Sequence, residues 1–117
     1  MTNVVLLRGR LSREPAARTL PSGDPLTVLE LTVPAGAGAG RAESVGLSWF
    51  DAPDWVTRLA GGAELVVLGR IRRRFFQTPA GLQSRTEVVV EHGAPAGHAA
   101  RAAAVHKRAV ALVGDGT

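Results

Sequence analysis

One short segment of the sequence, residues 69–76 with the letters GRIRRRFF, concentrates charge and aromatic rings. On a β-strand alternate side chains share a face, so one face carries three guanidinium groups and a ring, those of Arg70, Arg72, Arg74 and Phe76. Such cations bind the phosphates along a nucleic-acid strand, and an aromatic ring stacks on a base. Each stacking contact contributes about 1–3 kcal/mol. The pattern favours binding of a single-stranded nucleic acid. The alternative is a solvated edge strand whose charges prevent aggregation.

A second aromatic candidate ends the segment 44–50. One face of this predicted strand is apolar and faces the core, whereas the other is small and polar except for Phe50. A shallow surface that ends in a ring can admit a nucleotide strand. Alternatively, Phe50 packs into the core at the corner between strand and helix. Trp49 and Trp55 are predicted to be packing residues.

Composition excludes several other kinds of chemistry. The chain has 117 residues, no cysteine and a formal net charge of +4, and every basic residue except Lys107 is arginine. Absence of cysteine excludes disulfides and thiolate zinc sites. The histidines lack ligand partners at metal-binding spacing, and neither a phosphate-binding loop nor a nucleophile elbow occurs. We expect no enzymatic activity, no metal, no cofactor and no membrane span.

Hydrophobic periodicity predicts an all-β fold. Five strands are expected at residues 3–11, 26–33, 44–50, 63–76 and 83–91. One short helix, residues 51–59, lies between the third and fourth strands. This order is typical of the OB-fold, a five-stranded Greek-key barrel.

The composition divides the chain into two parts, a domain of residues 1–93 and a basic, alanine-rich tail of residues 94–117. Alanine favours helix, but an isolated helix of this length is marginal without packing. The tail is therefore predicted to be flexible or weakly helical.

Over residues 3–91 the sequence resembles the bacterial single-stranded DNA-binding protein family. The resemblance is carried by residues 3–11, Glu14-Pro15, Pro21-Ser22-Gly23, the run 69–76 and residues 86–90. It implies an OB-fold that binds single-stranded DNA without sequence preference in replication, recombination and repair. It further implies a homotetramer or homodimer in the bacterial cytoplasm, associated with the nucleoid.

The resemblance also implies roles for single residues. Phe76 and Phe50 match base-stacking positions, and Arg72 and Arg74 match positions that contact the backbone and bases. Further cations on or near the binding face are Arg8, Arg10 and Arg70.

Two departures from the family support a second hypothesis. Ser44 stands where the family usually has a stacking Trp, and residues 113–117 do not form the family's acidic tip, so recruitment of repair proteins is not expected. The alternative function is an OB-fold paralogue with weak DNA affinity that acts as a protein-interaction or primosome-type scaffold.

Overall fold

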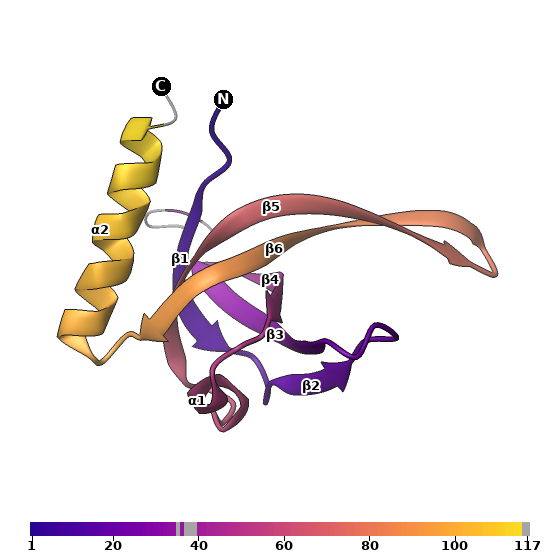
Figure 1. Ribbon diagram of the computed structural model, residues 1–117, viewed down its shortest axis with the longest axis horizontal. Coiled ribbons are helices and arrows are strands. Elements are labelled where there is room, and N and C mark those ends of the chain that lie inside the picture. The colour runs from indigo at the N-terminus through magenta and orange to yellow at the C-terminus, as the bar shows by residue number, and fades with distance from the viewer. Residues whose placement is uncertain (35, 37–39, 116–117) are drawn as a thin grey trace.

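The computed structural model describes residues 1–34, 36 and 40–115. Its elements are β1 (Val5–Leu11), β2 (Ala16–Thr19), β3 (Pro25–Pro34), β4 (Ala42–Phe50), α1 (Asp54–Thr57), β5 (Glu64–Thr78), β6 (Gly81–Pro95) and α2 (Ala99–Asp115). The strands form one sheet in the order β1-β5-β6-β4-β3-β2, and β1 also pairs with β3. This second pairing closes five strands into a barrel and leaves β2 at its edge (Figure 1). The mostly β architecture is consistent with the OB-like barrel that the sequence predicts.

Alternating apolar residues fill the barrel. The inward face predicted for β4 is confirmed, since Leu47 and Trp49 are buried, and on β3 the alternate residues Leu29 and Leu31 are buried as well. The short helix α1 adds Val56, which is fully buried in the same core cluster. Trp55 meets the ring of Trp49 edge-on, with 5.9 Å between the ring centroids.

The strands β5 and β6 are longer than the barrel, and they project from it as a hairpin (Figure 1). We call the projecting part, residues 70–86, the arm. Alternation along β5 predicts that Ile71, which shares parity with the buried Leu65 and Val67, also faces the core. The structure corrects this expectation, since Ile71 is 51% exposed. Beyond Gly69 the side chains of β5 are exposed or half-buried, whereas β6 stays in the barrel at Val88 and Val89, which are buried and pair with β4.

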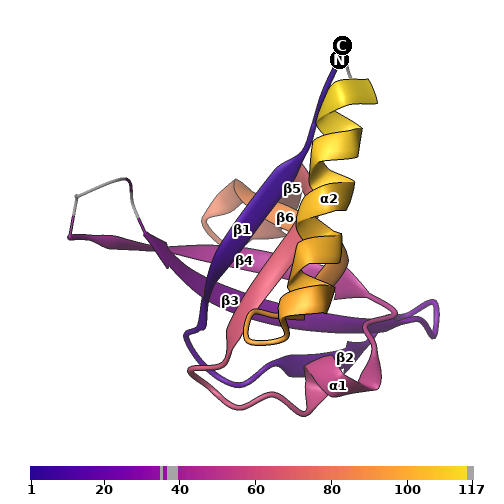
Figure 2. The ribbon, with the colours of Figure 1, turned by 90° about the vertical axis from the view of Figure 1, so that its left-hand side faces the viewer.

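The C-terminal segment differs from the flexible or weakly helical tail that the sequence predicts. It forms the 17-residue helix α2, which lies against β5, β6 and β1 (Figure 2). Its stripe of Ala102, Val105 and Ala109 is buried against Val66 and Leu68 of β5. Packing of this stripe supplies the stability that an isolated helix lacks. The predicted boundary between residues 93 and 94 falls inside β6.

A glycine permits the close approach of β5 and β6 where the arm begins. The pairing register shifts between Leu68 and Gly69, and a Cβ at Gly69 would lie 2.1 Å from the carbonyl oxygen of Val89. Only a residue without a side chain fits there without moving the backbone.

We therefore predict that Gly69→Ala lowers the free energy of unfolding by about 1–3 kcal/mol, the usual cost of overpacking. Urea denaturation measures this change. Gly46→Ala is the matched control in β4, because a Cβ there meets nothing within 4 Å. An alanine in the interior of that strand is expected to be neutral or stabilising by about 0.5–1 kcal/mol. Equal stability of Gly69→Ala and the wild type would contradict the close approach.

Candidate nucleic-acid interface

The pairing of β5 with β6 determines which side chains share a face of the arm. Residues directly opposite each other in an antiparallel pair lie on the same face. Arg72 is opposite Glu87, Arg74 is opposite Arg85, and Phe76 is opposite Gln83. The structure thus brings Arg72, Arg74 and Phe76 onto one face, which we call the arginine face of the arm.

Arg74 and Arg85 place two like charges directly across the hairpin. Both side chains are exposed, and among the described residues neither forms an ion pair with a carboxylate. Like charges at opposed positions destabilise a strand pair. An anion that lies between the two guanidinium groups would relieve their repulsion, so the arginine face is suited to a phosphate.

Phe50 and Arg72 are held together where the arm joins the barrel. The guanidinium carbon of Arg72 lies 5.7 Å from the centroid of the Phe50 ring. Arg72 also donates from Nε to a carboxylate oxygen of Glu87 at 3.2 Å, and the hydroxyl of Ser48 donates to the other oxygen at 2.7 Å. Phe50 is 37% exposed, so its ring is not packed into the core, which was the alternative role considered for it.

The carboxylate of Glu87 is the group that fixes Arg72. Burial, which leaves Glu87 7% exposed, tends to raise its pKa. Hydrogen bonds from Arg72 and Ser48, together with the charges of Arg72 and Arg74, outweigh burial and hold the pKa below its ordinary value of 4.5. Glu87 is therefore ionised at neutral pH and orients the guanidinium over Phe50.

Two other predicted residues lie elsewhere. Arg8 and Arg10 of β1 surround Glu64 at the start of β5, with nitrogen–oxygen distances of 2.7 and 3.4 Å. The hydrogen bond from Arg8 is the main cause that lowers the pKa of Glu64. At about 3.3 Å per residue, Glu64 lies about 26 Å along β5 from Arg72. The structure does not bring Arg8 and Arg10 to the arginine face.

Arg70 occupies an intermediate position on β5. Its Nη1 atom lies 3.8 Å from a carboxylate oxygen of Glu91 on β6. Both side chains are about half exposed, so solvent weakens this pair. Arg70 lies on the same side of β5 as Arg72, at the base of the arm.

Sequence reasoning missed three residues of this region, namely Ser48 as a hydrogen-bond donor, Arg85 and Glu87. The signal for Arg85 and Glu87 was present in the hairpin itself. Thr78 pairs with Gly81 across a two-residue turn, and this turn fixes the register of every pair above it. Counting back from such a turn places Arg85 opposite Arg74 and Glu87 opposite Arg72.

Comparison with known proteins adds no family to this description. No protein-family model matches the chain, and no curated protein matches it. Within residues 1–34, 36 and 40–115, no cluster of three acidic or histidine side chains is placed to hold a metal ion. In the same part of the chain, no helix combines the length and the apolar character needed to cross a membrane.

The lowered pKa of Glu87 gives a testable pH dependence. Because the pKa is lower in the folded state, the folded protein binds fewer protons, and stability falls as the pH drops from about 4.5 through that lower pKa. We predict that Glu87→Gln costs about 1–3 kcal/mol at neutral pH, since it leaves buried donors poorly satisfied. The difference from the wild type should shrink on acidification below about pH 4.5.

Urea denaturation of both proteins from about pH 7 to pH 3 measures this difference. Glu43→Gln is the control, because Glu43 is exposed on the same sheet. It is expected to change stability by less than about 0.5 kcal/mol. A Glu87→Gln deficit that stays constant over the whole pH range would show that the charge of Glu87 has no part in the effect.

Proposed function

We propose that this protein binds single-stranded DNA without sequence preference, through the arginine face of the arm and the ring of Phe50. The observation that carries the proposal is the opposition of Arg74 and Arg85 on the arm, with the exposed ring of Phe76 farther along the arm and that of Phe50 under Arg72 at its base. The resemblance to the bacterial single-stranded DNA-binding family supports it. The proposal includes an OB-fold barrel, a homotetramer or homodimer, and a role in replication, recombination and repair.

The chemistry of the face explains why a single strand would be preferred. Arg74 and Arg85 neutralise phosphates, and the rings of Phe50 and Phe76 stack on bases. A duplex keeps its bases stacked on each other, so their faces are not accessible to a protein ring. Stacking reads no base edges, and phosphates are the same in every sequence. Binding is therefore expected to depend on strand state and salt rather than on sequence.

A second candidate function is a protein-interaction scaffold with weak DNA affinity. The specific observation in its favour is the opposite face of the arm, where apolar side chains are exposed. Ile71, Phe75 and Leu82 are 51%, 63% and 68% exposed, and the hairpin register puts them on one side. A surface of this kind fits a protein partner or a second copy of the chain.

The first prediction of the proposed function concerns affinity and salt. A labelled oligo-dT of about 35 nucleotides should bind tightly in the presence of duplex competitor, and more weakly as salt rises. In Arg74→Ala, the slope of log affinity against log salt should shrink by about 0.7, the value for one phosphate of a single strand. Fluorescence anisotropy at several salt concentrations measures both quantities.

Arg73→Ala is the matched control, because Arg73 is the next residue of β5 and lies on the opposite face of the arm. It removes the same charge and should change the slope by clearly less. Binding of oligo-dT no stronger than binding of duplex would contradict the proposed function and favour the scaffold.

The second prediction separates stacking from charge. Phe76→Ala should weaken oligo-dT binding by about 1–3 kcal/mol, the contribution of one stacked base, while leaving the salt slope nearly unchanged. Phe75→Ala removes an identical, more exposed ring from the other face and should leave affinity unaltered. The same anisotropy titration serves for both variants. If the two variants behaved alike, Phe76 would have no stacking role.

A further inference from the structure

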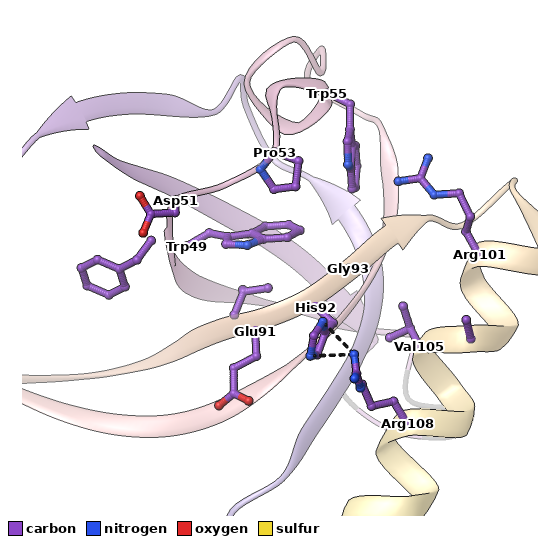
Figure 3. Close-up of a pocket in the computed structure, with 13 residues that line it drawn as sticks. Trp49, Asp51, Pro53, Trp55, Glu91, His92, Gly93, Arg101, Val105 and Arg108 are labelled. Carbon is purple, nitrogen blue, oxygen red and sulfur yellow. Dashed lines mark hydrogen bonds between the residues drawn. The ribbon is translucent and has the colours of Figure 1, made fainter. Parts of the chain in front are cut away.

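A cleft of about 650 Å³ lies between α2, the end of β6 and the segment that leads into α1 (Figure 3). Its walls include Trp49, Phe50, Trp55, His92, Arg101 and Arg108. Its volume is within the range of about 300–1,000 Å³ that is usual for small-ligand sites. Sequence reasoning predicted no cleft here, because the segment of α2 was expected to be a flexible or weakly helical basic tail.

The helix presents its cations to the cleft in a fixed arrangement. Arg101, Ala104, Val105 and Arg108 have the spacing i, i+3, i+4 and i+7, which puts them on one face of α2. Burial of Val105 against the barrel fixes the rotation of this face. The two guanidinium groups are thus positioned by the packing of the helix.

Each of these arginines rests on a ring of the opposite wall. The guanidinium carbon of Arg101 lies 4.9 Å from the centroid of Trp55, and Nη1 of Arg108 lies 3.1 Å from Nε2 of His92. In the described part of the chain, neither arginine forms an ion pair. Both cations therefore keep donors and charge for an anionic ligand.

The carboxylates of the cleft are at its other side. Figure 3 shows Asp51 and Glu91 on the side of the cleft away from Arg101 and Arg108. Glu91 lies 3.8 Å from Arg70, which partly neutralises it. An anion in the cleft is therefore expected on the helix side, beside Arg101 and Arg108.

Phe50 connects the cleft with the arginine face. Its ring lies under the guanidinium group of Arg72, and it also lines the cleft. A DNA strand that crosses the arm and stacks on Phe50 reaches the cleft next. Of the two tryptophans that line the cleft, Trp49 is buried in the core, whereas Trp55 is half-buried beside Arg101.

We propose that this cleft holds a nucleotide of the same DNA strand as it leaves the arm. Its phosphate is bound by Arg101 and Arg108, and its base lies against the half-buried ring of Trp55. The helix α2 is then a part of the binding surface. This inference rests on the proposed function and extends the strand's path beyond Phe50.

The first test uses two alanines of α2. Ala104 lines the cleft, and Ala103 is exposed on the same helix outside it. Oligo-dT of about 4 to 16 nucleotides, the range of site sizes of one OB-fold, is titrated against Ala104→Glu and Ala103→Glu. The longer oligomers should bind Ala104→Glu about tenfold more weakly than Ala103→Glu, because a carboxylate then faces the phosphate. The shortest oligomers contact only the arm, so they should bind Ala104→Glu and Ala103→Glu with equal affinity.

The second test removes the cations themselves. The double variant Arg101→Gln/Arg108→Gln should reduce the salt slope for long oligo-dT by about 0.7, the value for the one phosphate that the two arginines share. Lys107→Gln removes a neighbouring cation outside the cleft and should change the slope by clearly less. Tryptophan fluorescence provides an independent readout, since both tryptophans line the cleft. Long oligomers should quench it in the wild type and fail to do so in Ala104→Glu.

The outcomes separate this inference from the proposed function. Ala104→Glu and the double variant could bind oligomers of every length as tightly as the wild type does, while Arg74→Ala still binds more weakly. That result would overturn the proposed role of the cleft but leave the arm as the binding face. Failure of the wild type to bind oligo-dT would overturn both. Quenching by free dTMP at oligomer-like concentrations would identify a mononucleotide site instead. Circular dichroism shows whether α2 stays folded in each variant. If Ala104→Glu unfolds the helix, the double variant Arg101→Gln/Arg108→Gln tests the cleft in its place.

Discussion

β5 and β6 pair in one antiparallel ladder that runs from Leu65 opposite Pro95 to Thr78 opposite Gly81, interrupted by one register shift. The first part of this ladder belongs to the barrel and the last part is the arm. In the barrel, the outer face of β5 also provides the surface against which α2 packs, through Val66 and Leu68. Barrel closure, presentation of the arginine face and the position of the C-terminal helix therefore all depend on the same pair of strands.

The register shift separates two environments on the same strands. At the shift Glu91 has no residue opposite it, because Leu68 pairs with His92 and Gly69 pairs with Val90. Such a bulge bends and twists the ladder, which allows the arm to leave the barrel. Before the bulge both faces of β5 are buried, one by the core and one by α2, whereas after it both faces reach solvent. This change explains why alternation along the sequence correctly places Val67 in the core but incorrectly places Ile71 there.

Sequence reasoning worked where the signal is local. Alternation within a strand was enough for the inward face of β4 and for the alignment of Arg72 with Arg74. It did not reveal contacts between distant segments, such as that of Ser48 with Glu87 or of α2 with the outer face of β5. The docking stripe of α2 consists largely of alanine, so its hydrophobic periodicity is weak, and the apolar outer positions of β5 were the stronger clue. Arg8 and Arg10 point to the same face of the sheet as the arginine face, but they lie beside the start of β5, far from the arm. Alternation along a strand identifies the face of a side chain and not its position along the neighbouring strand.

Ion pairing shows where the positive charge is available for a ligand more clearly than the net charge of +4 does. Glu64 partners Arg8 and Arg10, and Glu87 partners Arg72. In the described chain no such partner exists for Arg74 and Arg85 on the arm, or for Arg101 and Arg108 in the cleft. These two arginine pairs lie on either side of Phe50, whose ring touches both regions. A phosphate backbone repeats its charge at regular intervals, so a strand that stacks on Phe50 presents phosphates in both directions at once. A ligand with one isolated anion could use only one of the two pairs, which is why a polymer fits this distribution of charge better than a small molecule does.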